Sequence, residues 1–229
     1  MKERPVLFSA PMVRTILEGK KTQTRRIVAM PRKRDWYVVV DHGNGWWPYQ
    51  SDDGESDLCD DSMEHPYICP YGQPGDRLWV KETWRPRLAL SPWDVVITYA
   101  ADGQQRTIKD GDFGDRDWTM PKAAVHGNVT PLFMPRWASR ITLEVTDVRV
   151  ERLQDISEAD AKAEGVEGHY IKDGWYWRNY SLSNEDASTS PMLTNAKDSY
   201  RTLWEKLNSP GSWAANPWVW VVSFRRLDL

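Results

Sequence analysis

The sequence is poor in the residues that build several common kinds of site. It holds two cysteines and four histidines in 229 residues, too few for a disulfide framework or an obvious histidine-based triad. The motifs GxxxxGK[ST], GxGxxG, HExxH and GxSxG are all absent, which argues against phosphate-binding loops, dinucleotide folds, zinc proteases and α/β hydrolases. Any catalysis should therefore depend on lysine, threonine, carboxylates or a metal ion.

Long apolar runs are also missing. No stretch of about 18 apolar residues occurs, so we expect no transmembrane helix and no membrane partner. The segment from Met1 to Pro5 lacks the apolar core of a signal peptide. These absences predict a cytoplasmic protein whose cysteines stay reduced. The sequence indicates no cofactor and leaves the oligomeric state open.

A metal site can be imagined around the two cysteines. The spacing Cys59-x5-His65-x3-Cys69 places a histidine between them, and His42 lies upstream. This spacing is a poor match to the paired CxxC arrangement of structural zinc sites. We therefore predict no metal and treat Cys59 and Cys69 as ordinary thiols in a long insertion, with zinc as the alternative.

Charge is distributed unevenly along the chain. The net charge of −3 shows that the chain is not a basic nucleic-acid binder by composition. Basic residues nevertheless crowd the first segment: Arg14, Lys20, Lys21, Arg25, Arg26, Arg32, Lys33 and Arg34. Acidic residues crowd the next one: Asp52, Asp53, Glu55, Asp57, Asp60, Asp61 and Glu64. The basic segment is either a surface that faces phosphates or a solvated patch neutralised by the acidic one.

The expected elements are mostly strands. Apolar spacing predicts a helix from Met12 to Leu17, with Ser9 as its cap and Gly19 at its end. Period-2 alternation predicts a strand over Ile141–Val150, and Ser157 to Gly165 has the cap and stop signals of a helix. A further helix is expected from Tyr200 to Leu207 and a last strand over Pro217–Arg225.

Because strands outnumber the short helices, we predict an α+β fold, a small mixed β-barrel with helices at its mouth. Residues 1–229 should form a single domain. Three polar insertions interrupt it, at about residues 30–73, 103–133 and 167–198.

The segment Gly19–Arg26, which reads Gly-Lys-Lys-Thr-Gln-Thr-Arg-Arg, contains a possible site. We expect it to form an exposed turn after the first helix. Thr24 is a possible nucleophile, and Lys21 could take its proton if burial and neighbouring cations lower the pKa of the amine. Guanidiniums such as Arg25 and Arg26 can grip phosphate groups. The alternative is a positively charged turn that binds nothing in particular.

The same segment resembles the signature of ASCH domains, a branch of the PUA-like β-barrels. Its pattern Gly-x-Lys-x-x-(Glu or other)-x-Arg is met by Gly19, Lys21, Thr24 and Arg26. The turn Pro74–Asp76 before a strand, the strand Ile141–Val150 and the helix after it follow the family's order, as does the Trp-rich last strand. The resemblance covers somewhat under half of the chain and implies a PUA-like barrel. The whole chain resembles larger phage and prophage ASCH proteins more closely than the minimal ASCH barrel.

One branch of small ASCH proteins, the bacterial N4-acetylcytidine amidohydrolases, resembles this chain more finely. The resemblance implies that Lys21, Thr24 and Glu164 are catalytic. Lys21 would deprotonate Thr24, Thr24 would attack the acetyl carbonyl, and Glu164 would move protons and help water to release the acyl group. Other branches imply a non-catalytic RNA- or DNA-binding module or a metal-dependent ribonuclease, and these alternatives stay open.

Tryptophan is abundant, with 14 residues against four phenylalanines. Some of these rings could stack nucleobases, whereas others should pack the insertions onto the barrel. The segment Arg136-Trp137-Ala138-Ser139-Arg140 interleaves basic and aromatic residues and is the best candidate for contact with a nucleoside or RNA. The predicted binding residues are Arg25, Arg26, Trp79, Arg136, Trp137 and Arg140.

Overall fold

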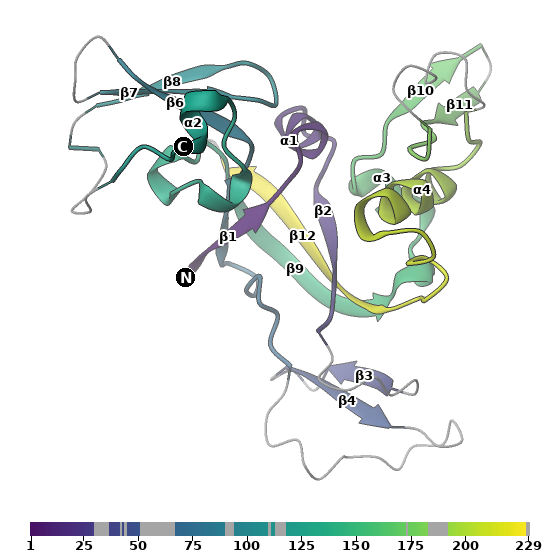
Figure 1. Cartoon of the computed structure of the whole chain (residues 1–229). Coiled ribbons are helices and arrows are strands. Elements are labelled where there is room, and N and C mark those ends of the chain that lie inside the picture. The colour runs from purple at the N-terminus through teal and green to yellow at the C-terminus, as the bar shows by residue number, and fades with distance from the viewer. Residues whose placement is uncertain are drawn as a thin grey trace. The chain divides into compact units, whose positions relative to one another are not determined.

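The computed structural model describes residues 1–29, 37–41, 43, 45–50, 67–89, 94–109, 111–112, 118–172, 174–182 and 192–227. Strands outnumber helices among them and the helices are short, so the expected mixed α+β class is confirmed (Figure 1). The backbone divides into two compact units, each built from separated stretches of sequence. Unit 1 comprises Met1–Thr22, Pro74–Thr146 and Phe224–Leu229, and unit 2 comprises Gln23–Gln73 and Asp147–Ser223.

The described strands form four sheets. The largest has the order β1-β5-β9-β12-β2, from strands Glu3–Leu7, Arg77–Lys81, Thr142–Arg152, Trp218–Leu227 and Gln23–Ile27. Within unit 1, β1 runs parallel to β5, and β5 pairs antiparallel with the start of β9. Within unit 2, β12 pairs antiparallel with β2. The described strand orders are open, so closure into a barrel stays a prediction.

Helix α1 (Ala10–Leu17) confirms the first expected helix. Pro11 suits its first turn, and Val13 and Ile16 are buried. Gly19 ends the helix with a φ of +71°, a conformation that a residue with a side chain would adopt only with strain. The backbone amides of Lys20 and Lys21 then donate to the carbonyl of Thr15 at 2.8 and 3.0 Å. This closure fixes the path of the chain as it leaves the helix.

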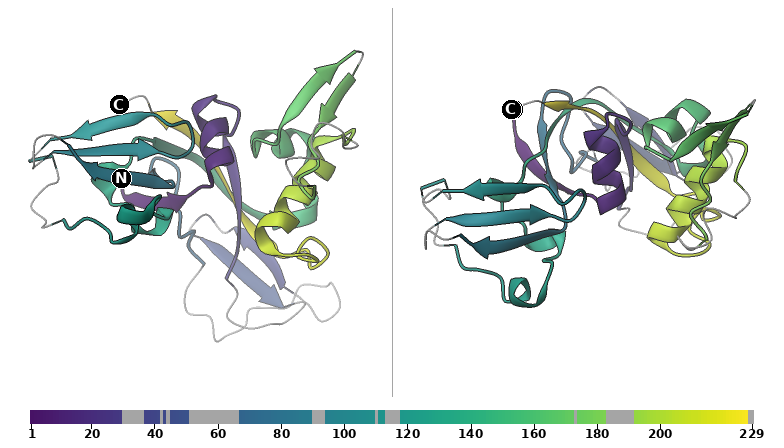
Figure 2. Two further views of the ribbon diagram at one scale, coloured as in Figure 1. Left: turned by 45° about the horizontal axis from the view of Figure 1, so that its top comes forward. Right: turned by 90° about the horizontal axis from the view of Figure 1, so that it is seen from above.

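The rest of unit 1 is a three-stranded antiparallel sheet with short helices. The strands are β6 (Trp84–Leu88), β7 (Val95–Tyr99) and β8 (Gln105–Ile108), and Figure 2 shows them side by side. The helices are α2 (Ala123–His126), η1 (Pro131–Phe133) and η2 (Arg136–Ala138). In β7 the buried residues alternate with half-buried ones, because one face covers the core that includes Trp84 and Ile97. The second polar insertion thus contains β8, α2 and η1, which the sequence did not predict.

Unit 2 combines two hairpins with three helices. The hairpins are β3–β4 (Tyr37–Asp41 and Trp46–Gln50) and β10–β11 (Gly168–Ile171 and Gly174–Trp177), and the helices are η3 (Leu153–Asp155), α3 (Glu158–Ala163) and α4 (Ala196–Asn208). The expected cap of α3 is confirmed, since the Ser157 hydroxyl accepts from the amide of Asp160 at 3.0 Å. Asn195 caps α4 in the same way, and α3 packs against α4 (Figure 1).

Candidate functional site

The turn expected over Gly19–Arg26 ends at Thr22, and its expected exposure is wrong for Lys21 and from Gln23 onward. Thr24, Arg25 and Arg26 lie in strand β2, opposite Val222, Val221 and Trp220 of β12. Pairing with this apolar strand satisfies the backbone of β2 and buries its side chains. Thr24 and Arg25 are each only 3% exposed, and Arg26 is half-buried. The polar residue types suggested solvent exposure, whereas the pairing partner, far away in sequence, decides the burial.

The Arg25 guanidinium is fully enclosed and bound on three sides. Its Nη2 and Nε donate to Glu151 Oε1 at 2.5 and 3.0 Å. Its Nη1 donates to Gln23 Oε1 at 2.7 Å and to Glu164 Oε1 at 3.2 Å. Burial opposes the charge, but the neighbouring carboxylates outweigh it and hold the pKa of Arg25 above its ordinary value. Arg25 is thus a charged anchor inside unit 2.

Glu164 is one of the carboxylates that Arg25 binds. It follows the last turn of α3 as its C-cap and is 3% exposed, so it is not a surface residue. Besides Arg25, it has a hydrogen bond with the phenol of Tyr200 on α4. Burial, together with the negative charge of Glu164, raises the pKa of Tyr200 well above its ordinary value. The phenol therefore keeps its proton and donates a hydrogen bond to the carboxylate.

A second layer of charges surrounds these residues. Arg149 donates to Glu151 Oε2 at 3.1 Å and to Asp160 Oδ2 at 3.0 Å. Asp160 lies 3.4 Å from Arg25 Nη2 and accepts from the Ser157 hydroxyl at 2.9 Å. Burial raises the pKa of Asp160, but the hydrogen bond from Ser157 and the two arginines lower it by more. The pKa of Asp160 is therefore below its ordinary value. The network should hold the Glu164 side chain in one orientation.

Lys21 belongs to unit 1 and is 2% exposed. Its ammonium lies 5.6 Å from the centre of the Phe8 ring, within the range of a cation–π contact. Thr24 and Glu164 belong to unit 2. All three predicted catalytic residues are therefore buried polar groups. Of the predicted site residues in unit 2, Arg25 and Glu164 are in contact. The convergence of Lys21 with Thr24 and Glu164 stays a prediction.

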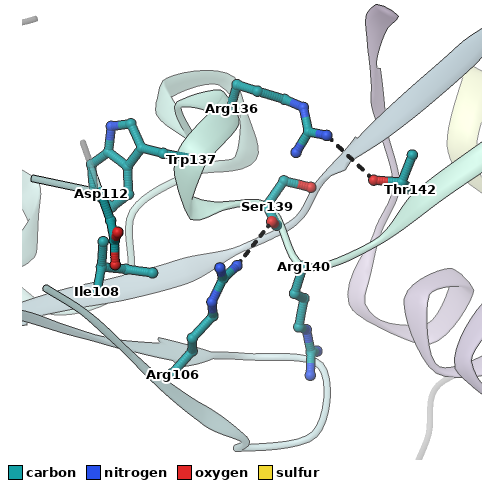
Figure 3. Close-up of a pocket in the computed structure, with 8 residues that line it drawn as sticks. All are labelled: Arg106, Ile108, Asp112, Arg136, Trp137, Ser139, Arg140 and Thr142. Carbon is teal, nitrogen blue, oxygen red and sulfur yellow. Dashed lines mark hydrogen bonds between the residues drawn. The ribbon is translucent and has the colours of Figure 1, made fainter. Parts of the chain in front are cut away.

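A separate pocket of about 670 Å³ lies in unit 1 (Figure 3). Its lining comprises Arg106, Ile108, Asp112, Arg136, Trp137, Ser139, Arg140 and Thr142. The predicted binding residues Arg136, Trp137 and Arg140 are thus brought to one cavity. Arg106 completes the lining from β8, and no local sequence pattern pointed to this residue.

The predicted binding residues of this pocket also have structural partners. Arg136 donates to Glu3 at 2.9 Å and to Thr142 at 3.4 Å. Trp137 meets Trp84 edge to face at 6.3 Å and Trp118 at 5.1 Å, so its ring packs against the core of unit 1. These contacts give both side chains a role in packing, and contact with a nucleoside or RNA stays a prediction for them.

Arg140 is held by two carboxylates. It donates to both oxygens of Glu82 at 2.9 and 3.0 Å and to Asp102 at 2.8 and 3.0 Å. Its guanidinium also lies 4.0 Å from the centre of the Tyr99 ring. Glu82 is 1% exposed, and burial raises its pKa despite the opposing effect of Arg140. In contrast, Arg106 is exposed and donates to the carbonyl of Ser139 at 3.3 Å, with no carboxylate contact found among the described residues.

The other predicted features are distributed over both units. Trp79 is half-buried on β5, with the Lys81 ammonium 5.4 Å from its ring. Cys69 is buried, whereas His42, Cys59, His65, the arginine–lysine run 32–34 and the acidic run 52–64 lie outside the described residues. In the part of the chain that the structure describes, no three His, Cys, Asp or Glu side chains are grouped to hold a metal ion.

No protein-family model, curated protein or solved structure matches the chain. None of the helices in the described ranges has the length and apolar character needed to cross a membrane.

Proposed function

We propose that this chain is an amidohydrolase that removes an acyl group from an N-acylated nucleobase such as N4-acetylcytidine, on a PUA-like ASCH barrel. The observation that carries the proposal is the burial of the three polar side chains, with Lys21 at 2% and Thr24 and Glu164 at 3% exposure. Burying a lysine or a glutamate is costly unless its charge is compensated. Such groups are characteristic of sites where a proton is moved.

The roles follow from the chemistry of each group. Thr24 attacks the acyl carbonyl while Lys21 accepts the hydroxyl proton. The carbon–nitrogen bond then breaks, the exocyclic nitrogen takes that proton, and the acyl group stays on Thr24 as an ester. Glu164 accepts a proton from the water that attacks the ester and passes it to the Thr24 oxygen as the ester bond breaks, which releases the carboxylic acid and restores both side chains. These reaction steps need no metal or cofactor.

Arg25 and Tyr200 give Glu164 a defined position in this scheme. A general base is effective when its side chain is held in one orientation by its neighbours. The Arg25 guanidinium at 3.2 Å and the Tyr200 phenol both hydrogen-bond to this carboxylate. We therefore assign Arg25, which the sequence suggested as a phosphate ligand, to positioning Glu164.

Wild-type protein incubated with N4-acetylcytidine should release cytidine and acetate. Chromatography of the reaction mixture measures the cytidine. Thr24→Ala should lower kcat/KM by at least about 100-fold, since no hydroxyl is left to form the ester. Thr24→Ser should retain activity. Thr22→Ala is a matched control, because Thr22 is exposed and only two residues away. The absence of cytidine with the wild type, or full turnover by Thr24→Ala, would remove the proposal.

A non-catalytic nucleic-acid-binding function is the second candidate, and the pocket in unit 1 favours it. Three of its lining residues are arginines, and arginine forks bind phosphates well. Because Arg136 and Arg140 already bind carboxylates, Arg106 is the guanidinium best placed to meet a phosphate.

Arg106→Ala should therefore weaken RNA binding and reduce the slope of log K against log salt concentration by about 1. Lys109→Ala, an exposed cation three residues later that does not line the pocket, is the control. Fluorescence anisotropy with a labelled oligonucleotide at several salt concentrations measures the affinity and the salt slope of each variant. Equal slopes for the wild type and Arg106→Ala would exclude this site as the phosphate contact.

A further inference from the structure

The β10–β11 hairpin of unit 2 presents aromatic rings to solvent. Tyr170 is 64% exposed and Trp175 is 57% exposed. The two residues are direct partners in the antiparallel register, so their side chains lie on the same face of the hairpin. Their ring centres are 5.9 Å apart at an interplanar angle of 68°. Figure 1 shows the hairpin as a distinct element beyond α3 and α4.

A buried ring anchors this exposed pair. Trp177 is 7% exposed and stacks on Trp175 at 5.8 Å and 21°. Its indole covers Gly168 so closely that a Cβ at that position would lie 2.6 Å from the ring. Only glycine leaves room for this arrangement. The rings of Trp177, Trp175 and Tyr170 thus form a ladder from the core of unit 2 to its surface.

The exposed part of the ladder is too small for a stable protein interface. Two aromatic side chains that are a little over half exposed offer on the order of 250 Å², whereas a specific interface buries about 800 Å² on each partner. The apolar residue nearest in sequence, Ile171, pairs with Gly174 and lies on the opposite face. A planar ligand that covers only the ring faces fits this surface better.

The charges beside the ladder favour an anionic ligand. The Lys162 ammonium lies 5.4 Å from the centre of the Trp177 ring. Arg178 neutralises Glu167 at 2.6 Å. Lys162 is exposed, and so is Lys172 directly after β10. Nucleobases stack on aromatic rings whatever their sequence, and cations nearby attract the phosphates between them.

We propose that Tyr170 and Trp175 form a stacking platform for unpaired bases of single-stranded RNA. The binding of RNA is inferred from the hairpin alone. The substrate class that it implies rests on the proposed function: the acylated base would be part of an RNA strand, and the unpaired bases next to it would stack on the platform.

Binding of a fluorescein-labelled, unstructured 12-nucleotide RNA, measured by anisotropy, tests the platform. Trp175→Ala and Tyr170→Ala should each raise Kd by roughly 5- to 150-fold, the range that one stacked base supplies. Trp175→Phe should retain most of the affinity because it keeps a ring. Tyr176→Ala, on the same strand but the opposite face, should bind like the wild type. Unchanged Kd for Trp175→Ala and Tyr170→Ala, or an equal loss in Tyr176→Ala, would overturn the proposal.

Two further measurements separate the alternatives. Release of cytidine from free N4-acetylcytidine should be the same for Trp175→Ala and the wild type, so an inactive wild type refutes the enzyme without affecting the binding result. Light scattering over a range of concentrations tests for a second copy of the chain on the platform. Self-association that is lost in Trp175→Ala, together with no RNA binding by the wild type, would replace RNA with a second copy as the occupant.

Discussion

Replacing Arg25 with methionine should lower the free energy of unfolding by about 3–5 kcal/mol. The guanidinium is 0% exposed and compensates Glu151, Asp160 and Glu164. Methionine fills similar volume but leaves the buried Glu164 without its cation, whereas Glu151 and Asp160 keep Arg149. The loss therefore comes mainly from unpaired negative charge, with a smaller contribution from the hydrogen bond to Gln23.

Chemical denaturation at neutral pH, with the transition followed by circular dichroism, measures this effect. Arg26→Met is the matched control, because Arg26 is the next residue on β2 and is half-buried. Its loss should be clearly smaller. Adding Glu164→Gln to Arg25→Met should recover part of the stability, since the stranded charge is removed. An effect of Arg25→Met no larger than that of Arg26→Met would show that the network contributes little.

The elements that sequence alone predicted correctly have local causes. The spacing of Val13 and Ile16 with Gly19 beyond them gives α1, alternation gives β9, and Ser157 gives the start of α3. Each signal is contained within a few residues, where helix and strand periods and caps operate. The last helix was predicted from Tyr200, but it begins at Ala196 because Asn195 caps it.

The arrangement of the candidate site could not be predicted from local patterns. Arg25 contacts Glu151, 126 residues away, and Glu164, 139 residues away. Resemblance to a family suggested Glu164, but no pattern suggested Tyr200, whose position on α4 looks like ordinary core spacing. These pairings depend on which strands and helices meet, and that information is not contained in either segment alone.

The basic-aromatic segment 136–140 shows why composition gives an ambiguous prediction. Arginine and tryptophan interleave in nucleic-acid-binding surfaces, but the same residues also make ion pairs and edge-to-face packing. Here Trp137 packs against Trp84, and Arg140 binds Glu82. Glu82 follows β5 and Trp84 begins β6, and local patterns do not reveal that either lies beside this segment. The distinction between binding and packing therefore required the fold.

Arg140→Met should also lower the free energy of unfolding by about 3–5 kcal/mol at neutral pH. Its fork binds Glu82, which is 1% exposed, so the substitution leaves a buried carboxylate with no cation. Burial already raises the pKa of Glu82 above its ordinary value of 4.5, and loss of Arg140 removes the main effect that opposes burial. The pKa of Glu82 in the variant should therefore rise further.

The pH dependence of this loss identifies its cause. A carboxyl whose pKa is higher in the folded than in the unfolded state binds a proton more readily when folded. Its ionisation therefore destabilises the fold above the folded pKa, and this cost disappears as pH falls toward 4.5. The stability difference between Arg140→Met and the wild type should narrow between about pH 7.5 and pH 5. Denaturation across this range measures it.

Two variants make the Arg140 test specific to Glu82. Adding Glu82→Gln to Arg140→Met should restore much of the stability at neutral pH and flatten the pH dependence, because the buried carboxylate is no longer present. Arg136→Met is the control, since its partner Glu3 is 38% exposed and such a surface pair contributes only about 0–1 kcal/mol. A loss for Arg140→Met that is the same at every pH would mean that its packing on Tyr99, rather than the charge of Glu82, causes the effect.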